Sequence, residues 1–325
     1  NQVPGITISE THTDATCFGG TNGTATVQLS GGLPPYQCNW SDAGTQAVRN
    51  NLSAGNYIVT AQDANGCTAS LNINIGEAAQ INLTATKIDA TCYGTNTGHL
   101  ILNLSGGTPP YNYSWSNNYI VPQMANIAAG VYTVTVADNS HCTATSAYTV
   151  NQPNAISMQV NTVLPTCNGG NNGSINVTAG GGTGAIQYAW SNGEQTSFIS
   201  NLASGNYSLT LTDANNCTAN YSVTITQPNQ LSVTETHQAV SCNSGNTGSI
   251  NLTTNGGTNP FNYVWNDGVA AEDRNQISAG IYSVTVIDVN NCSTSVQATI
   301  NEPTALQISE THNAVLCNGG NNASI

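Results

Sequence analysis

The cysteines are the residues of this chain whose chemistry and regular spacing indicate a specific role. The chain holds 10 of them, and all except Cys38 fall into two series with a constant period of 75. The first series is Cys17, Cys92, Cys167, Cys242 and Cys317, and the second is Cys67, Cys142, Cys217 and Cys292. Paired cysteines in small domains form disulfides in oxidising compartments, so this spacing predicts structural disulfides and an extracellular location.

Two disulfide pairings fit this spacing. Within one period the pairs would be Cys17–Cys67, Cys92–Cys142, Cys167–Cys217 and Cys242–Cys292, each two thirds of a period apart, with Cys317 unpaired. Across period boundaries they would be Cys67–Cys92, Cys142–Cys167, Cys217–Cys242 and Cys292–Cys317, each one third of a period apart, with Cys17 unpaired. The first set is preferred, because a self-contained domain should carry its own disulfide. Closing a loop of about 50 residues would contribute on the order of 4 kcal/mol.

One geometric condition weighs against the preferred pairing. A disulfide needs its two Cα atoms within about 7 Å of each other. In a seven-stranded sandwich the end of the first strand and the start of the last strand lie at opposite ends. The pairing therefore requires either that a strand is missing or that Cys17 precedes the segment that pairs with the last strand.

Cys38 lies outside both series, and the equivalent positions hold Tyr113, Tyr188 and Tyr263. We interpret it as a free thiol buried beside Trp40, because cysteine packs as a small apolar side chain. A cross-link or a reactive site is the alternative interpretation.

Other candidate sites are weaker. Loops such as CNGGNNG resemble a phosphate cradle, but no Lys and no helix follows them, so they indicate turns. An aspartate recurs at Asp63, Asp138, Asp213 and Asp288. Calcium would need about six to eight oxygen ligands, and the other acidic residues do not keep the period, so an Asp that opens a turn is preferred.

The sequence predicts no catalytic, cofactor-binding or metal-binding residues. The tripeptide Glu-Thr-His occurs at 10–12, 235–237 and 310–312, but a metal or acid–base site would need further partners. No Ser/His/Asp set, Cys/His set or carboxylate pair persists between periods. We therefore expect that the protein is not an enzyme and that it needs no cofactor.

Composition excludes several classes of partner. Only 6% of the residues are charged, and three cations oppose 16 acids, which gives a formal charge of −13. A nucleic-acid partner and an anionic membrane surface are both disfavoured by that charge. No apolar run approaches the roughly 20 residues that span a bilayer, and Asn1 begins no signal peptide.

The same period extends to the apolar residues, which predicts four repeats and the start of a fifth. We expect domains at 1–76, 77–152, 153–227 and 228–302, with 303–325 opening a truncated repeat. Each period contains short runs of alternating apolar residues, such as Tyr57, Val59 and Ala61, and none with helical spacing. The predicted core anchors are Trp40, Trp115, Trp190, Trp265, Tyr57, Tyr132, Tyr207 and Tyr282.

Six or seven short strands in each period indicate an all-β fold of tandem immunoglobulin-like β-sandwiches. The segment NLSAGNY, which ends on Tyr57, resembles the tyrosine corner of that fold and recurs in each period. The linkers GEAAQ, QPNA, QPNQ and EPTA are short and usually contain proline. Short linkers of this kind predict an extended rod.

Several spaced motifs recur in the same order in the four periods: C-x-G-x-x-x-G, GG-x-x-PY-x-x-x-W, L-x-x-G-x-Y and D-x-x-x-C. In the first period they consist of Cys17, Gly31, Gly32, Pro35, Tyr36, Trp40, Leu52, Gly55, Tyr57, Asp63 and Cys67. This set resembles the SprB-type repeat, which occurs in large surface adhesins of gliding bacteria that are exported by type IX secretion. The third period departs from it, since it lacks the proline and has Ile186 in place of the tyrosine, and the fourth has Phe261 in that place.

The resemblance implies a structural and adhesive segment of a long extracellular filament on the cell surface, as in a gliding-motility adhesin. It implies as partners further copies of the same repeat in a longer chain, a surface polysaccharide or substratum, and a motility or secretion machine. It implies no catalytic residues. The alternatives are an array of carbohydrate- or calcium-binding modules, or the non-catalytic stalk of a larger surface enzyme.

Overall fold

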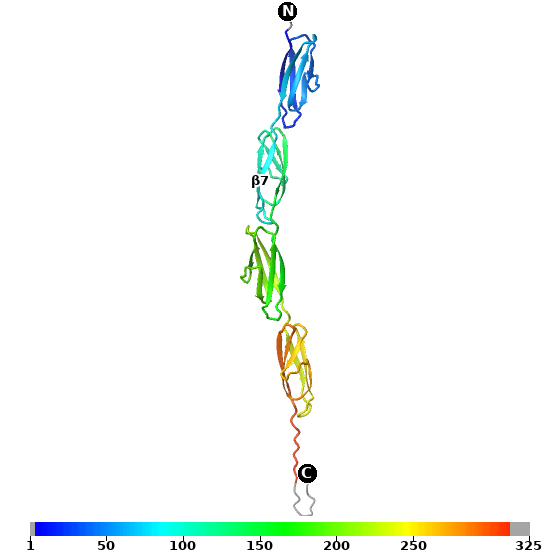
Figure 1. Ribbon diagram of the computed structural model, residues 1–325, viewed down its shortest axis with the longest axis vertical. Coiled ribbons are helices and arrows are strands. Elements are labelled where there is room, and N and C mark those ends of the chain that lie inside the picture. Colours follow the sequence, from blue (N-terminus) through cyan, green and yellow to red (C-terminus); the bar gives the residue numbers. More distant parts are fainter. Residues whose placement is uncertain (1–3, 313–325) are drawn as a thin grey trace, which may run out of the picture. The chain divides into compact units, whose positions relative to one another are not determined.

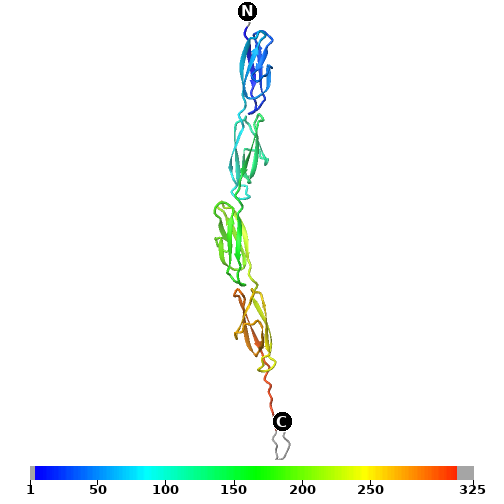
Figure 2. The ribbon, with the colours of Figure 1, turned by 45° about the vertical axis from the view of Figure 1, so that its right-hand side comes forward.

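The computed structural model describes residues 4–312, and within that range the regular structure consists of β-strands without a helix. The 24 strands fall into four successive groups of six, one in each period of the sequence (Figure 1). Figure 2 shows the same groups from a second direction. The prediction of an all-β chain of tandem repeats is therefore confirmed. Over the described residues, no helix is long and apolar enough to cross a membrane.

The strands occupy equivalent positions in the four groups. The first group is β1 (Thr7–Thr13), β2 (Gly23–Ser30), β3 (Gln37–Trp40), β4 (Val48–Leu52), β5 (Gly55–Gln62) and β6 (Thr68–Ile75). The second is β7 (Asn82–Ile88), β8 (Gly98–Ser105), β9 (Asn112–Trp115), β10 (Gln123–Ile127), β11 (Gly130–Ala137) and β12 (Thr143–Val150). The third is β13 (Ser157–Val163), β14 (Gly173–Gly180), β15 (Gln187–Trp190), β16 (Phe198–Leu202), β17 (Gly205–Thr212) and β18 (Thr218–Ile225). The fourth is β19 (Ser232–Gln238), β20 (Gly248–Asn255), β21 (Asn262–Trp265), β22 (Arg274–Ile277), β23 (Gly280–Ile287) and β24 (Ser293–Ile300).

Each group forms a sandwich of two antiparallel three-stranded sheets. In the first sandwich one sheet has the order β1-β2-β4 and the other β3-β5-β6, and the other three sandwiches repeat this order. It is the strand order of a constant-type immunoglobulin domain, A-B-E on C-F-G, without strand D. Of the six or seven strands that the sequence allows, the structure has six, and strand D is the missing one.

Alternation of apolar residues explains why these segments form two-layered β-structure. In β2 the inward residues Ala25 and Val27 are buried, and in β6 Ile73 and Ile75 are buried. Val59 and Ala61 of β5, which is next to β6 in the same sheet, are also buried, at 0% exposure. Residues at alternate positions of a strand point to one face, so one apolar face of each sheet covers the other.

The predicted tryptophan anchors lie in the cores. All four are buried, and each indole N–H donates a hydrogen bond to the backbone carbonyl six residues later, for example from Trp40 to Gln46 at 2.9 Å. This bond satisfies the polar atom that burial would otherwise leave unpaired. The buried tryptophan on the third strand is a further feature of the immunoglobulin fold.

The predicted tyrosine anchors are half-buried and form the tyrosine corner. The hydroxyl of Tyr57 donates to the backbone carbonyl of Ser53 at 3.0 Å. Tyr132, Tyr207 and Tyr282 make the same bond to the residue four positions earlier. This hydrogen bond at the start of the fifth strand confirms the tyrosine corner that the sequence indicates.

Strand directions place different loops at the two ends of a sandwich. At the end where the chain enters, Gly32 donates to the carbonyl of Pro4, and Leu33 donates to Asp63 in the turn after β5. At the end where the chain leaves, the loop after β1 meets the residues after β6, since Ala15 donates to the carbonyl of Gly76. We call these the entry end and the exit end.

The chain divides into two compact units. One unit holds the first two sandwiches together with Gly181–Gly184 and Ala214–Cys217, and the other holds β13 to β24. Gly181–Gly184 and Ala214–Cys217 are turns at the entry end of the third sandwich. They belong to the unit that contains the preceding sandwich.

Candidate functional site at the ends of the repeats

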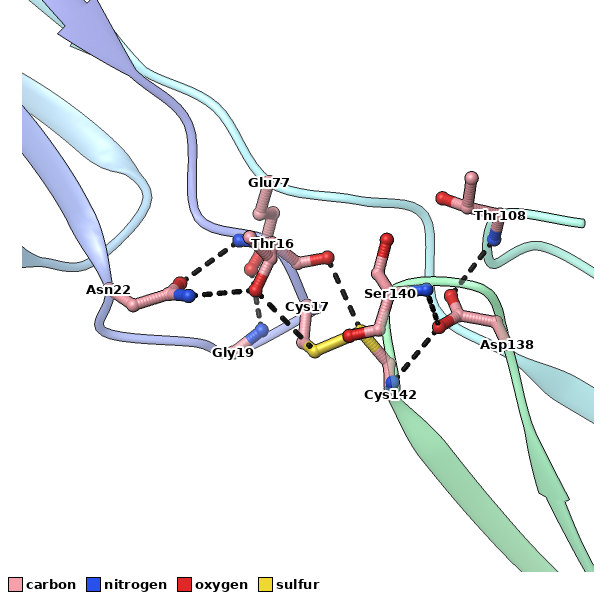
Figure 3. Close-up of a disulfide and its surroundings, with 9 residues drawn as sticks. All are labelled: Thr16, Cys17, Gly19, Asn22, Glu77, Thr108, Asp138, Ser140 and Cys142. Carbon is pink, nitrogen blue, oxygen red and sulfur yellow. Dashed lines mark hydrogen bonds between the residues drawn. A yellow bond between two sulfur atoms is a disulfide. The ribbon is translucent and has the colours of Figure 1, made fainter.

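Within residues 4–312, three disulfides join one repeat to the next. They are Cys17–Cys142, Cys92–Cys217 and Cys167–Cys292, with Cα atoms 5.5, 5.6 and 5.6 Å apart and a sequence separation of 125 residues in each case. Each bond links the loop after the first strand of one sandwich to the turn after the fifth strand of the next sandwich. Figure 3 shows the first of these sites. We call the two loops the exit loop and the entry turn.

Both disulfide pairings predicted from the sequence are wrong. Cys17 lies in the exit loop of the first sandwich and Cys67 in its entry turn, so the length of the strands separates them. Cys67 and Cys92 cannot meet either, because Cys67 is at the entry end of the first sandwich and Cys92 is at the exit end of the second. The two cysteine series meet only where an exit loop reaches the entry turn of the following repeat.

The exit loop is held by its own hydrogen bonds. Gly20 donates to the carbonyl of Cys17 at 2.9 Å, and Gly19 between them has a φ of 68°, a conformation that glycine adopts without strain. The side chain of Asn22 accepts from the backbone N–H of Thr16 and donates to its hydroxyl. The Gly- and Asn-rich loop is therefore a turn, as the sequence indicates, and it fixes the direction of the cysteine.

A glutamate or glutamine in the linker ties that linker to the exit loop. The carboxylate of Glu77 accepts a hydrogen bond from the backbone N–H of Gly19 at 2.6 Å. The same contact is made by Gln152 with Gly94, Gln227 with Gly169 and Glu302 with Ser244, at 2.7–2.8 Å. Sequence reasoning missed these four residues, although their period of 75 was a usable signal.

A buried aspartate organises the entry turn that carries the second cysteine. In the first site Asp138 accepts hydrogen bonds from the backbone N–H groups of Thr108, Ser140 and Cys142, each at 2.9 Å (Figure 3). Asp63 and Asp288 do the same in their own sandwiches. The interpretation of the recurring Asp as a turn residue is confirmed, and the contact with Thr108 shows that it also holds the neighbouring loop.

These hydrogen bonds favour the ionised carboxylate. The backbone N–H of Thr108 is the main cause that holds the pKa of Asp138 below its ordinary value, with Cys142 and Ser140 acting in the same direction. Desolvation opposes this shift but does not reverse it. Leu33 has the corresponding effect on the pKa of Asp63. A hydrogen bond to the charged form stabilises that form, so the turn is held best above the pKa of the aspartate.

A pair of glycines after the second strand clamps the incoming linker. Gly107 donates to the carbonyl of Ala79 at 2.9 Å, and Gly106 and Gly107 have φ values of 76° and 67°. A Cβ atom on Gly106 would lie 1.9 Å from the carbonyl oxygen of Gln80. The Gly-Gly motif is therefore needed for both the backbone conformation and the close approach of the linker.

We call the place where an exit loop meets the next entry turn a joint. Hydrogen bonds across the joints supplement the disulfides. The side chain of Asn215 donates to the carbonyl of Thr91, and that of Asn290 donates to the carbonyl of Thr166, both at 3.3 Å. In the first joint the Sγ atom of Cys142 lies 3.3 Å from the carbonyl oxygen of Thr16. The carbonyl of the residue before the exit-loop cysteine is therefore a recurring contact in these joints.

Among the described cysteines, Cys38, Cys67 and Cys242 are free. Cys38 is buried in the first core next to Trp40, and burial raises the pKa of its thiol. Cys67 and Cys242 are exposed. Their equivalents in the other repeats are the disulfide cysteines of an entry turn and an exit loop, respectively. Cys317 lies outside the described residues.

The other candidate residues from the sequence do not assemble into a site. Glu10 pairs with His12 at 3.0 Å and Glu235 with His237 at 2.9 Å, on exposed strand surfaces. Over residues 4–312 no group of three or more His, Cys, Asp or Glu side chains is placed to hold a metal ion. The described residues that converge are those of the joints, and their chemistry is covalent cross-linking by disulfides.

Strand order, buried tryptophans and tyrosine corners define the class: a tandem array of immunoglobulin-like sandwiches. The sequence model of the SprB repeat matches the chain four times, over residues 9–45, 84–119, 160–195 and 234–270. Each match begins in the first strand of a sandwich and ends just beyond the third strand. The chain is a SprB-type repeat protein. The match includes the exit-loop cysteine of each disulfide but not the entry-turn cysteine.

No curated protein sequence matches the chain. Among solved structures, the eight N-terminal immunoglobulin domains of Down Syndrome Cell Adhesion Molecule align at a TM-score of 0.32 and 9% identity, over 93% of this chain and 61% of that one. Immunoglobulin domains 1–5 of Sidekick-1 align at a TM-score of 0.33 and 10% identity, over 90% and 77% of the two chains. The chain thus spans less than two thirds of the first of these structures, and the fold assignment rests on its own strand order.

Proposed function

We propose that this chain is a structural and adhesive segment of a long filament on the outside of the cell, of the kind that acts as a gliding-motility adhesin. The observation that carries the proposal is the disulfide that joins each SprB repeat to the next. A bond within a domain would stabilise only that domain, whereas a bond between domains adds a second covalent link between them. A filament that transmits force needs domains that do not separate.

Surface chemistry supports the same assignment. The chain carries a formal charge of −13, and only 6% of its residues are charged, so exposed surface is built mainly from Asn, Thr, Ser and Gly. Uncharged polar side chains solvate well and resist the charge-driven binding of other macromolecules. In such a filament, partners would be further SprB repeats, a polysaccharide or solid substratum, and the export and motility machinery of the cell surface.

We further propose that the segment is non-catalytic and works without a cofactor. The buried carboxylates Asp63, Asp138 and Asp288 are used up in backbone hydrogen bonds, which leaves them unsuited to acid–base catalysis. The residues with the strictest spacing are all used in cores and joints. A glycan array tests the alternative of a carbohydrate-binding module, because saturable binding of one glycan class by the isolated chain would support that alternative.

The direct experiment labels living, intact cells that produce the protein with fluorescent Fab fragments raised against this chain. We expect label on the outer surface that travels along the cell, and none with Fab fragments against an unrelated protein. Stationary surface label would contradict the motility role but would still agree with a filament on the cell surface. Label that appears only after cells are permeabilised would overturn the extracellular assignment as well.

A further inference from the structure

The three disulfides overlap along the sequence. Cys92 lies between Cys17 and Cys142, and Cys167 lies between Cys92 and Cys217. Every peptide bond between Cys17 and Cys292 is therefore spanned by at least one disulfide. We propose that this overlap keeps the chain in one covalent piece after any single backbone cut in that range, which protects a surface filament against severing by proteases. The inference concerns covalent connectivity and holds whether or not the filament takes part in motility.

Two covalent routes that share no backbone connect Cys17 with Cys292. The first crosses to Cys142, follows the backbone to Cys167 and crosses to Cys292. The second follows the backbone from Cys17 to Cys92, crosses to Cys217 and follows the backbone to Cys292. Loss of either route leaves the other intact, so Cys17 and Cys292 stay covalently connected.

The shorter route contains little chain that could be pulled out. Its backbone part runs from Cys142 to Cys167 and consists mainly of β12 and β13. A strand already rises about 3.3 Å per residue, close to the limit of an extended chain. Tension on this route therefore acts on backbone that is already extended and can release little further length. The other strands of the sandwiches are not part of this route.

A second covalent route matters because exposed segments of the chain can be cut by proteases. In the loop after β9, the side chains of Tyr119, Ile120 and Val121 are 43%, 76% and 44% exposed. Exposed loop tips and linkers are the preferred sites of proteolytic nicking. With disulfides confined to single repeats, one cut in a linker would release everything beyond it, whereas the observed bonds also span the linkers.

The wild-type chain has a composition that allows a direct test, because Lys87 is its one lysine. The protein is alkylated, unfolded in urea without reductant and digested with a lysine-specific protease, which cuts only after residue 87. We expect one species of full size on a non-reducing gel, and the pieces 1–87 and 88–325 after reduction, because Cys17–Cys142 spans the cut. Separation of the two pieces without reductant would overturn the proposal.

An arginine-specific protease tests two other positions in the same protein. It cuts after Arg49 and Arg274, which are spanned by Cys17–Cys142 and Cys167–Cys292 respectively. We expect the pieces 1–49, 50–274 and 275–325 to stay together until a reductant is added. Release of either terminal piece would show that the corresponding disulfide does not span its cut.

Among the disulfides of the described residues, only Cys92–Cys217 spans the segment between Cys142 and Cys167. A variant with Lys87→Gln and Asn161→Lys moves the lysine-specific cut to an exposed position of β13. We expect 1–161 and 162–325 to remain joined, and to separate without reductant when Cys92→Ser and Cys217→Ser are added. Separation in the presence of both cysteines would contradict the proposal.

Matched cysteine variants identify the disulfide that keeps the two pieces joined after cleavage. After lysine-specific cleavage, the Cys17→Ser/Cys142→Ser variant should release 1–87 without reductant. The Cys67→Ser variant should behave as wild type, because Cys67 is free. Pieces that stay joined in the double variant would show that another cross-link holds the cut, which would also overturn the proposed connectivity.

Discussion

The Cα atoms of Cys17 and Cys142 lie 5.5 Å apart, although 125 residues separate them along the chain. The bond between them belongs to neither of the two sandwiches that it joins. Its geometry depends on an exit loop held by Gly19 and Glu77 and on an entry turn held by Asp138. The stability of the joint and that of the two domains are therefore coupled.

Removal of the first disulfide should destabilise the chain. We expect the Cys17→Ser/Cys142→Ser variant to lose about 2–5 kcal/mol in free energy of unfolding, as is typical for a native disulfide that closes a long loop. Urea denaturation followed by tryptophan fluorescence measures the loss. Cys67→Ser, which removes an exposed free thiol, is the control and should unfold at the wild-type midpoint.

The Gly-Gly turn should tolerate no side chain next to the linker. Gly106→Ala puts a Cβ 1.9 Å from the carbonyl oxygen of Gln80, in addition to the strain of a φ of 76°. Gly94→Ala has the same backbone strain, with a φ of 71°, but its Cβ meets nothing within 4 Å. We expect Gly106→Ala to cost roughly 1–3 kcal/mol more than Gly94→Ala in thermal or urea unfolding. Equal losses would show that the linker moves aside freely.

Acid should weaken the entry turns. The pKa of Asp138 is lower in the folded chain than its ordinary value, so its ionised form contributes stability that is fully present above the unfolded pKa of about 3.9. That contribution is lost as the pH falls through the folded pKa. We expect the urea midpoint to drop below about pH 4, and to drop less steeply in Asp138→Asn. Identical pH profiles for the two proteins would contradict this role of the carboxylate.

The tyrosine corner should contribute a single hydrogen bond. Tyr132→Phe removes the bond of 2.8 Å from the hydroxyl to the carbonyl of Ala128 and keeps the ring. We expect a loss of about 0.5–1.5 kcal/mol, the usual net value of one such bond. Tyr119→Phe, at a side chain that is 43% exposed, serves as the control and should leave the midpoint unchanged.

The three free cysteines within residues 4–312 should differ in reactivity. Iodoacetamide at pH 8 is expected to label Cys67 and Cys242 in the native protein, because both are exposed. Cys38 should react only after unfolding, since burial limits access and raises the pKa of its thiol, which lowers the thiolate fraction. Peptide mass spectrometry resolves the three sites. Rapid native labelling of Cys38 would show that the first core opens readily.

The sequence by itself determined the main features that repeat within one sandwich. Period and alternation were enough to predict the strands around Val59 and Ala61, the buried Trp40 and the hydrogen-bonded corner at Tyr57. These features depend on contacts that each repeat makes with itself. Local patterns carry them, because alternate residues of a strand face the same side and a turn needs Gly, Asn or Asp at fixed positions.

Only the tertiary structure decided the disulfides. Spacing favoured pairs within one repeat or across a single linker, but strand D is absent and the remaining strands put Cys17 and Cys67 at opposite ends of the same sandwich. The partner of Cys17 is Cys142, in the next repeat, because an exit loop meets an entry turn only where two sandwiches join. A periodic sequence fixes which residues are equivalent, and the direction of each strand fixes which of them can meet.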